Sequence, residues 1–241
     1  MKVYAVTDVG LKRSMNQDSY LCLDEPIGLL PNCFVVADGM GGHNAGDFAS
    51  RFVVDSFVTT LRQSGERTKI QAIENAVMTA NAGLIEKAKE MPELAGMGTT
   101  FVLASVDEDN NLLAANIGDS RLYLISSGNI KQITMDHSVV AEMVRNGEIK
   151  KEEARFHPRK NEILRAISTE SVVTPDFYTL KVKHGDYVLL CSDGLSDMVD
   201  EAEMLKITDE YEDVGDISEK LLSLANENGG RDNITLVLIR I

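Results

Sequence analysis

Residues 98–134 read GTTFVLASVDEDNNLLAANIGDSRLYLISSGNIKQIT, and this stretch decides the fold. Short apolar runs alternate in it with turn-forming groups, DEDNN after the first run and SSGN after the third. Strands joined by connections this short pair antiparallel, because a parallel crossover needs a dozen or more residues. The stretch therefore predicts an antiparallel sheet and argues against a doubly wound parallel sheet.

Strands and amphipathic helices extend outward from this stretch in both directions. Residues 33–37, CFVVA, are almost wholly apolar, which predicts a strand buried on both faces. We expect further strands at 2–8, 19–23, 177–182, 186–192 and 233–240, and helices at 45–63 (capped by Asn44), 67–90, 201–207 and 213–227.

Two antiparallel sheets packed face to face, each covered by helices, accommodate both the buried strands and the amphipathic helices. The predicted class is α+β, a four-layer α-β-β-α sandwich. Residues 136–165 interrupt this pattern, because they are polar, mixed in charge and helix-prone, and we expect a helical flap there. The chain of 241 residues contains no Pro/Gly/Ser-rich linker and no repeat, which favours a single domain over residues 1–241.

The composition is acidic, with 24 Lys and Arg against 38 Asp and Glu, a formal charge of −14. Such a charge argues against nucleic acid or anionic lipid as the main ligand, although acidity by itself also fits plain solubility. No apolar segment approaches membrane-spanning length, and the N-terminal residues lack the pattern of a signal peptide. Cys22, Cys33 and Cys191 lie in or beside apolar runs, so we expect buried free thiols and a cytoplasmic location.

Aspartates at the ends of apolar runs are the main candidates for chemistry. Asp38 and Asp193 each end such a run and precede a glycine, Asp119 lies between two runs, and Asp232 opens the last one. Carboxylates gathered at one place need cations, and hard divalent metals are the usual partners. Each also has an ordinary alternative as a turn or helix cap, and Asp119 could form a hairpin turn with Arg121 as its ion-pair partner.

Other chemistry finds little support in the sequence. Arg13 precedes NQD in a loop opened by glycine, where its guanidinium could bind a phosphate through two parallel hydrogen bonds or serve as a surface arginine. The four histidines show no zinc-ligand spacing, and neither a G-x-S-x-G elbow nor a phosphate-binding Walker A loop is present.

The ordered motifs together resemble a known family. GLKRSMNQD, VVADGMGGH, MGTT, NIGDSR, DHS, CSDGLSD and GGRDNIT follow one another along essentially the whole chain. This set is similar to the motifs of the PPM family, the metal-dependent (type-2C) serine/threonine protein phosphatases, and DGMGGH resembles their bacterial branch.

The resemblance implies a β-sandwich flanked by helices, with two Mn²⁺ or Mg²⁺ ions in an active site at one edge. It implies that Asp38 bridges the two ions, that the Gly39 carbonyl holds the first, and that Asp193 and Asp232 hold the second. Asp18 would lie at the second ion through water, and Asp119, together with Asp193, would contribute to a third, weaker metal site. Arg13 would bind the substrate phosphate, so Asp38 and Arg13 are the expected catalytic residues.

The implied activity is hydrolysis of phosphoserine and phosphothreonine in proteins by a metal-activated water, in opposition to bacterial Ser/Thr kinases. Expected partners are phosphorylated proteins, including a Ser/Thr kinase, and we expect a monomer. The alternative is a metal-binding pseudophosphatase that binds a phosphoprotein without cleaving it. Two positions depart from the family pattern: Gln17 replaces a frequent glutamate, and Met40 stands where eukaryotic relatives have histidine.

Overall fold

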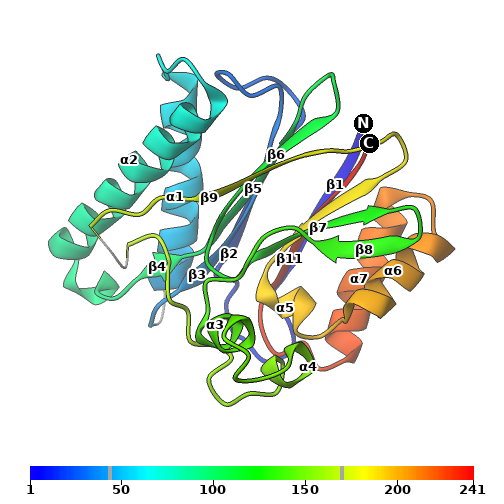
Figure 1. Ribbon diagram of the computed structural model, residues 1–241. Coiled ribbons are helices and arrows are strands. Elements are labelled where there is room, and N and C mark those ends of the chain that lie inside the picture. Colours follow the sequence, from blue (N-terminus) through cyan, green and yellow to red (C-terminus); the bar gives the residue numbers. More distant parts are fainter. Residues whose placement is uncertain (43–44, 169–170) are drawn as a thin grey trace.

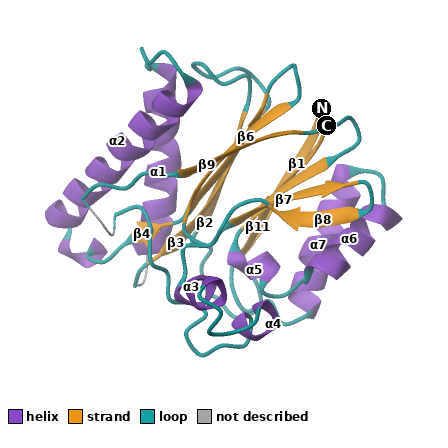
Figure 2. Cartoon of the chain, in the orientation of Figure 1, coloured by secondary structure: helices purple, strands orange, loops and turns teal. Residues whose placement is uncertain are grey.

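The computed structural model describes residues 1–42, 45–168 and 171–241, and its strands form two antiparallel sheets (Figures 1 and 2). The first sheet has the order β1-β11-β10-β7-β8: Lys2–Asp8, Ile234–Arg240, Tyr187–Cys191, Arg121–Ser126 and Asn129–Gln132. The second has the order β2-β3-β5-β6-β9: Asp18–Leu23, Cys33–Met40, Phe101–Val106, Asn111–Ile117 and Asp176–Lys181, with β4 (Gly98–Thr99) paired to β3.

Helices cover the outer face of each sheet, as Figure 1 shows. The helices α1 (Ala45–Arg62) and α2 (Lys69–Glu90) lie on the second sheet, with the short helix η1 (Pro92–Leu94) after them. The helices α5 (Asp193–Ser196), α6 (Glu201–Glu210) and α7 (Val214–Glu227) lie on the first. The predicted four-layer α-β-β-α sandwich is confirmed.

The alternation of side chains along β3 explains how the layers stack. Val35 and Ala37 pack in the cluster beneath α1 and α2, whereas Phe34 and Val36 pack between the two sheets, against residues such as Val237 of β11. Successive side chains of a strand point to opposite faces, so a strand in the middle of four layers must be apolar on both. The expectation of burial on both faces for residues 33–37 is therefore correct.

The segment that joins β8 to β9 contains the helices α3 (Val139–Arg145) and α4 (Lys151–Ala154), within the stretch where helical structure was expected. Among the described residues, no helix combines the length and the apolarity that crossing a membrane would require.

Two sequence predictions differ from the structure, and a third falls outside the described residues. The connection at residues 118–120 is not a hairpin turn, because β6 and β7 belong to different sheets and the chain crosses between them there. Cys22 is exposed on the edge strand β2, so the prediction of three buried thiols is wrong for this residue, although Cys33 and Cys191 are buried. Asn44, predicted to cap α1, lies outside the described residues.

The strand register brings several ends to one edge of the sandwich. In the second sheet, Asp18 at the start of β2 is paired with Asp38 near the end of β3. In the first sheet, Cys191 at the end of β10 pairs with Leu236 near the start of β11, and Asp8 at the end of β1 pairs with Ile234. The chain therefore delivers its Asp-containing loops from both sheets to the same edge.

Candidate active site

Asp18 and Asp38 stand directly opposite each other at the end of the β2–β3 pair. Like charges in that position destabilise a sheet unless something neutralises them. Ser192, which follows β10 in the other sheet, donates a hydrogen bond from its hydroxyl to Asp18 Oδ2 at 2.8 Å and accepts one from the Thr235 N–H at 3.0 Å. This serine therefore joins the ends of the two sheets directly at the carboxylates.

The backbone of Asp38 is held by two consecutive threonines. Its N–H donates to Thr100 Oγ1, and its carbonyl accepts from Thr99 Oγ1 and from the Thr100 N–H, each at 2.9 Å. Next to it, a Cβ on Gly39 would lie 2.1 Å from the Gly46 carbonyl oxygen and 2.4 Å from that of Gln17, so only glycine fits. The Asp-Gly pair is thus fixed by crowded backbone on several sides.

Asp193 and Asp232 come from adjacent loops of the first sheet. Asp193 is the first residue of α5, and a Cβ on Gly194 would lie only 1.9 Å from the carbonyl oxygen of Asn233. The glycine after Asp193 is therefore required by the close approach of the two loops, which brings Asp193 near Asp232. Asp232 precedes β11 and is partly exposed.

Arg13, in the loop between β1 and β2, donates from Nη2 to Asp232 Oδ2 at 2.6 Å. The guanidinium is about half exposed, at 52%, and the carboxylates of Asp232, Asp193 and Asp38 raise its pKa, chiefly through the hydrogen bond to Asp232. A cationic fork at a solvent-facing carboxylate cluster can accept an anion from solution.

The buried side chain of Asn233 holds this loop in place. Its Nδ2 donates to the carbonyl oxygens of Val9 and Met15, both at 2.9 Å, and its Oδ1 accepts the N–H of Gln17 at 2.8 Å. The residue directly after Asp232 thus fixes both ends of the segment that carries Arg13.

Asp119 lies in the crossover between β6 and β7. Its side chain is 8% exposed, and the expected alternative of an ion pair with Arg121 is wrong, because Arg121 binds Asp136 at 2.7 Å instead. No hydrogen-bond partner within the described residues reaches Asp119 Oδ1.

Burial raises the pKa of all four enclosed carboxyls, with neighbouring carboxylates adding to the effect. The pKa of Asp18 rises to about 6 and that of Asp119 to about 7, and the pKa values of Asp38 and Asp193 rise well above their usual range. Such shifts mean that the site, as the protein alone forms it, lacks the positive charge that ionised carboxylates need.

The donor set fits a hard divalent cation. Buried oxygens without any hydrogen-bond donor occur on three of the predicted ligands: Asp18, Asp119 and Asp193. Orphaned buried carboxylate oxygens are costly, and Mn²⁺ or Mg²⁺ would satisfy them. Over residues 1–42, 45–168 and 171–241, however, no three His, Cys, Asp or Glu side chains form a ready-made ligand group, so the individual ligand roles stay predictions.

Sequence reasoning assigned no role to Thr99, Thr100, Ser192 or Asn233. All four lie inside or beside motifs quoted for the family resemblance, MGTT, CSDG and GGRDN, so the signal was present as polar residues next to the aspartates. Their contribution is to hold backbone and loops rather than to present oxygens to a ligand.

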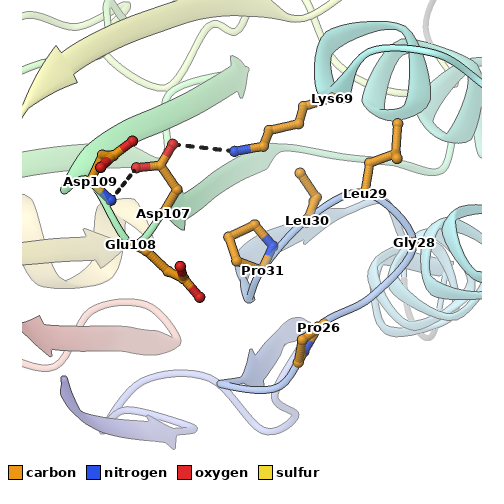
Figure 3. Close-up of a pocket in the computed structure, with 9 residues that line it drawn as sticks. All are labelled: Pro26, Gly28, Leu29, Leu30, Pro31, Lys69, Asp107, Glu108 and Asp109. Carbon is orange, nitrogen blue, oxygen red and sulfur yellow. Dashed lines mark hydrogen bonds and ion pairs between the residues drawn. The ribbon is translucent and has the colours of Figure 1, made fainter.

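A pocket of ≈ 400 Å³ lies elsewhere, near the turn between β5 and β6 (Figure 3). Figure 3 shows Lys69 of α2 reaching toward Asp107. The Lys69 Nζ lies 3.4 Å from Asp107 Oδ2. Since β3 and β5 run antiparallel with Phe34 opposite Ala104, this turn is at the opposite end of the strands from Asp38. The pocket is therefore separate from the group of carboxylates.

Comparison with known proteins agrees with this geometry. The family model described as Protein phosphatase 2C matches residues 12–232. The chain is 40% identical over 209 residues to the serine/threonine phosphatase stp of Listeria innocua, covering 85% of this chain and 82% of that protein. It is 38% identical over 247 residues to the protein phosphatase PhpP of Streptococcus pneumoniae, covering 99% of this chain and 97% of that one.

Solved structures give the same result. The catalytic domain of the serine/threonine protein phosphatase PstP in complex with 2 manganese ions superimposes with a TM-score of 0.84 at 33% identity, covering 98% of this chain and 96% of that one. With the family model spanning residues 12–232 and full-length relatives above 30% identity, this chain belongs to the protein phosphatase 2C family.

Proposed function

We propose that this chain hydrolyses phosphoserine and phosphothreonine in proteins, with two Mn²⁺ or Mg²⁺ ions held at the edge of the sandwich. The observation that carries the proposal is the meeting of carboxylates from both sheets beside the guanidinium of Arg13. Further support comes from the relatives, which are named serine/threonine or protein phosphatases. Their names do not favour the alternative of a pseudophosphatase.

The ligand roles follow the family pattern. Asp38 would contact both ions, the Gly39 carbonyl the first, and Asp193 and Asp232 the second, with Asp18 behind the second through water. Asp119 would serve a third, weaker site together with Asp193. When bound, the ions supply a nucleophilic water at neutral pH and compensate charge on the phosphoryl oxygens.

The residues of the chain orient the substrate around that centre. Arg13, whose guanidinium lies 2.6 Å from Asp232, binds the phosphate beside that carboxylate through parallel hydrogen bonds to the phosphoryl oxygens. Asn233 keeps the Arg13 loop at a fixed place relative to Asp232, so that the guanidinium and the carboxylates act on one phosphate group.

The biological setting belongs to the proposal as well. We expect residues 1–241 to act as one phosphatase domain and as a monomer in the cytoplasm, with residues 136–165 as a flap beside the active site. The substrates would be phosphoproteins, among them a Ser/Thr kinase. The formal charge of −14 argues against nucleic acid as a partner.

A phosphatase assay with a metal titration tests the proposal. The purified protein, stripped with EDTA, should not hydrolyse p-nitrophenyl phosphate or a phosphothreonine peptide, and Mn²⁺ or Mg²⁺ should restore turnover. Full turnover after exhaustive chelation would contradict the metal-dependent mechanism. Binding of the phosphopeptide in Mn²⁺ without any release of phosphate would instead favour the pseudophosphatase.

A further inference from the structure

His137 is a buried histidine at the start of the insertion, residues 136–165, and it contacts the crossover that carries Asp119. Its Nδ1 accepts the N–H of Gly118 at 3.0 Å, and its own N–H donates to the Gly118 carbonyl at 2.9 Å. Only 6% of His137 is exposed. His137 thus binds both peptide groups that flank Gly118, one through its ring and one through its backbone.

The other side of the ring identifies the tautomer. Because Nδ1 accepts a hydrogen bond, the ring proton must be on Nε2, which lies 3.1 Å from Asp176 Oδ2. Arg165 Nη1 donates to Asp176 Oδ1 at 2.9 Å and lies 3.0 Å from Nε2; with the proton on Nε2 both nitrogens are donors, so this second contact is not a hydrogen bond. Burial lowers the pKa of His137, in keeping with a neutral ring. Asp176 and Arg165 therefore hold the imidazole in the orientation that Gly118 requires.

Only glycine fits at position 118. Its φ is +101°, and a Cβ there would lie 2.6 Å from Thr100 Cγ2. Asp119 follows in the chain with a buried oxygen that has no hydrogen-bond donor. No hydrogen bond orients this oxygen, so the backbone at Gly118 contributes to the direction of the Asp119 side chain.

The residue before His137 holds the other flank. Asp136 forms hydrogen bonds with Arg121 through both carboxylate oxygens, at 3.2, 3.0 and 2.7 Å. The two ends of the insertion also meet here, because the Leu164 N–H donates to the His137 carbonyl at 2.7 Å and Ser138 forms a β-bridge with Ile163. His137 is thus the point where the insertion closes and where it touches the Asp119 crossover.

We propose that His137 is a positioning residue, whose Nδ1 fixes the Ile117–Gly118 peptide, and with it the Gly118 backbone, so that the Asp119 carboxylate faces the other carboxylates. The inference rests on the proposed function, because it treats Asp119 as a cation ligand. Because the ends of the insertion and the Gly118 backbone are bound to the same histidine, a displacement of one would also displace the other.

Two substitutions of His137 distinguish the hydrogen bond of Nδ1 from that of Nε2. In His137→Asn the side-chain oxygen is as many bonds from the backbone as Nδ1 and can accept from Gly118. In His137→Gln the side-chain nitrogen is as many bonds away as Nε2 and can donate to Asp176, but nothing replaces the Nδ1 acceptor. Loss of one such hydrogen bond should lower kcat about tenfold in the glutamine variant, whereas the asparagine variant stays within about twofold of wild type.

A measurement without metal or substrate tests the contact itself. In the EDTA-treated protein, amide hydrogen exchange followed by NMR should show a protected Gly118 N–H in wild type and in His137→Asn, and faster exchange in His137→Gln. The ¹⁵N shifts of the ring in the wild-type protein should show the proton on Nε2. Equal protection of Gly118 in both variants, or a proton on Nδ1, would overturn the proposal.

A double-mutant cycle with Asp119→Asn tests whether the effect passes through Asp119. If it does, His137→Gln should lower kcat about tenfold in wild type and by less than about twofold in Asp119→Asn. A full loss in both backgrounds means that His137 acts elsewhere and refutes the inference alone. No loss of activity in Asp119→Asn itself would refute instead the role of Asp119 in the proposed function, while the exchange measurement still decides the contact.

Discussion

Asp38 is the residue on which the proposed chemistry depends most, because it faces Asp18 and its backbone is fixed by Thr99 and Thr100. Asp38→Asn removes a charge from a crowded carboxylate group without changing the shape of the side chain. We expect kcat to fall by about 10³-fold, the scale of losing a central electrostatic contact in an active site. Steady-state kinetics with p-nitrophenyl phosphate in Mn²⁺ measures the change.

The fold of this variant should persist, since one repulsive charge is lost from the metal-free site. Circular dichroism and an unchanged elution volume would establish that. Asp109→Asn, at an exposed position in the turn at the other end of the strands, is the matched control and should retain full turnover. Retained turnover in Asp38→Asn would remove Asp38 from the catalytic centre.

Arg13 presents a different test at the same scale, because its guanidinium is solvent-facing and pairs with Asp232. Arg13→Ala should raise KM about tenfold with a smaller effect on kcat, and Arg13→Lys should recover only part of it, since an ammonium cannot form two parallel bonds to phosphate. Arg51→Ala, which breaks an exposed ion pair with Asp47 on α1, serves as the control. An unchanged KM for Arg13→Ala would count against phosphate binding by this residue.

At the scale of elements, the junction of α5 with the start of β11 determines how near Asp193 lies to Asp232. A Cβ at position 194 would be 1.9 Å from the Asn233 carbonyl oxygen, a backbone atom that cannot turn aside. Gly194→Ala should therefore lower the free energy of unfolding by about 1–3 kcal/mol, as overpacking does, and should also weaken metal-dependent activity.

Urea denaturation followed by circular dichroism measures the loss of stability. Gly65→Ala is the control, because a Cβ there meets no atom within 4 Å and its backbone needs no left-handed conformation. That variant should match wild type or gain slightly in stability. Equal midpoints for the two variants would show that the α5–β11 junction can relax.

The elements themselves could be predicted from the sequence where the signal was local. The continuous apolar run CFVVA and the spacing of apolar residues in residues 45–63 and 67–90 were enough for β3, α1 and α2. Which strands pair with each other could not be predicted, because a three-residue connection such as GDS can form either a hairpin or a crossover between two sheets. The helix α5 was missed since DGLS is four residues long and has the composition of a turn.

The candidate site shows the same division. Asp38, Asp119, Asp193 and Asp232 could be predicted as candidates because each ends, opens or lies between apolar runs, whereas Asp18 came from the family resemblance alone and the phosphate-binding role of Arg13 was supported by it. The exposure of Cys22 could not, since it depends on β2 being an edge strand. The contacts of Ser192, Asn233 and His137 join segments far apart in the chain, and such pairs leave no periodic pattern in a single sequence.

At the scale of the whole molecule, the buried carboxyls should make the stability of the metal-free protein depend on pH. Their pKa values are raised, to about 6 for Asp18 and about 7 for Asp119. The folded state therefore binds more protons than the unfolded chain, whose carboxyls titrate near ~4. The contribution of these groups is favourable at low pH and is lost as pH rises through about 4 to 7.

Cations that bind the ionised group should reverse this loss. Mn²⁺ stabilises the folded state according to its concentration relative to Kd, and it binds more tightly once the carboxylates are ionised. We expect the increase in Tm on adding Mn²⁺ to the EDTA-treated protein to be several degrees larger at about pH 8 than at about pH 5.5, since ~1 kcal/mol moves Tm by about 2–4 °C in a chain of this size. Differential scanning calorimetry at the two pH values measures both shifts.

Because other groups also titrate, Asp119→Asn is run beside wild type, and its smaller dependence on pH in EDTA isolates the contribution of the site. An identical Tm in EDTA-treated and Mn²⁺-loaded protein at both pH values would mean that the carboxylates do not bind the ion, and the proposed centre would have to be abandoned.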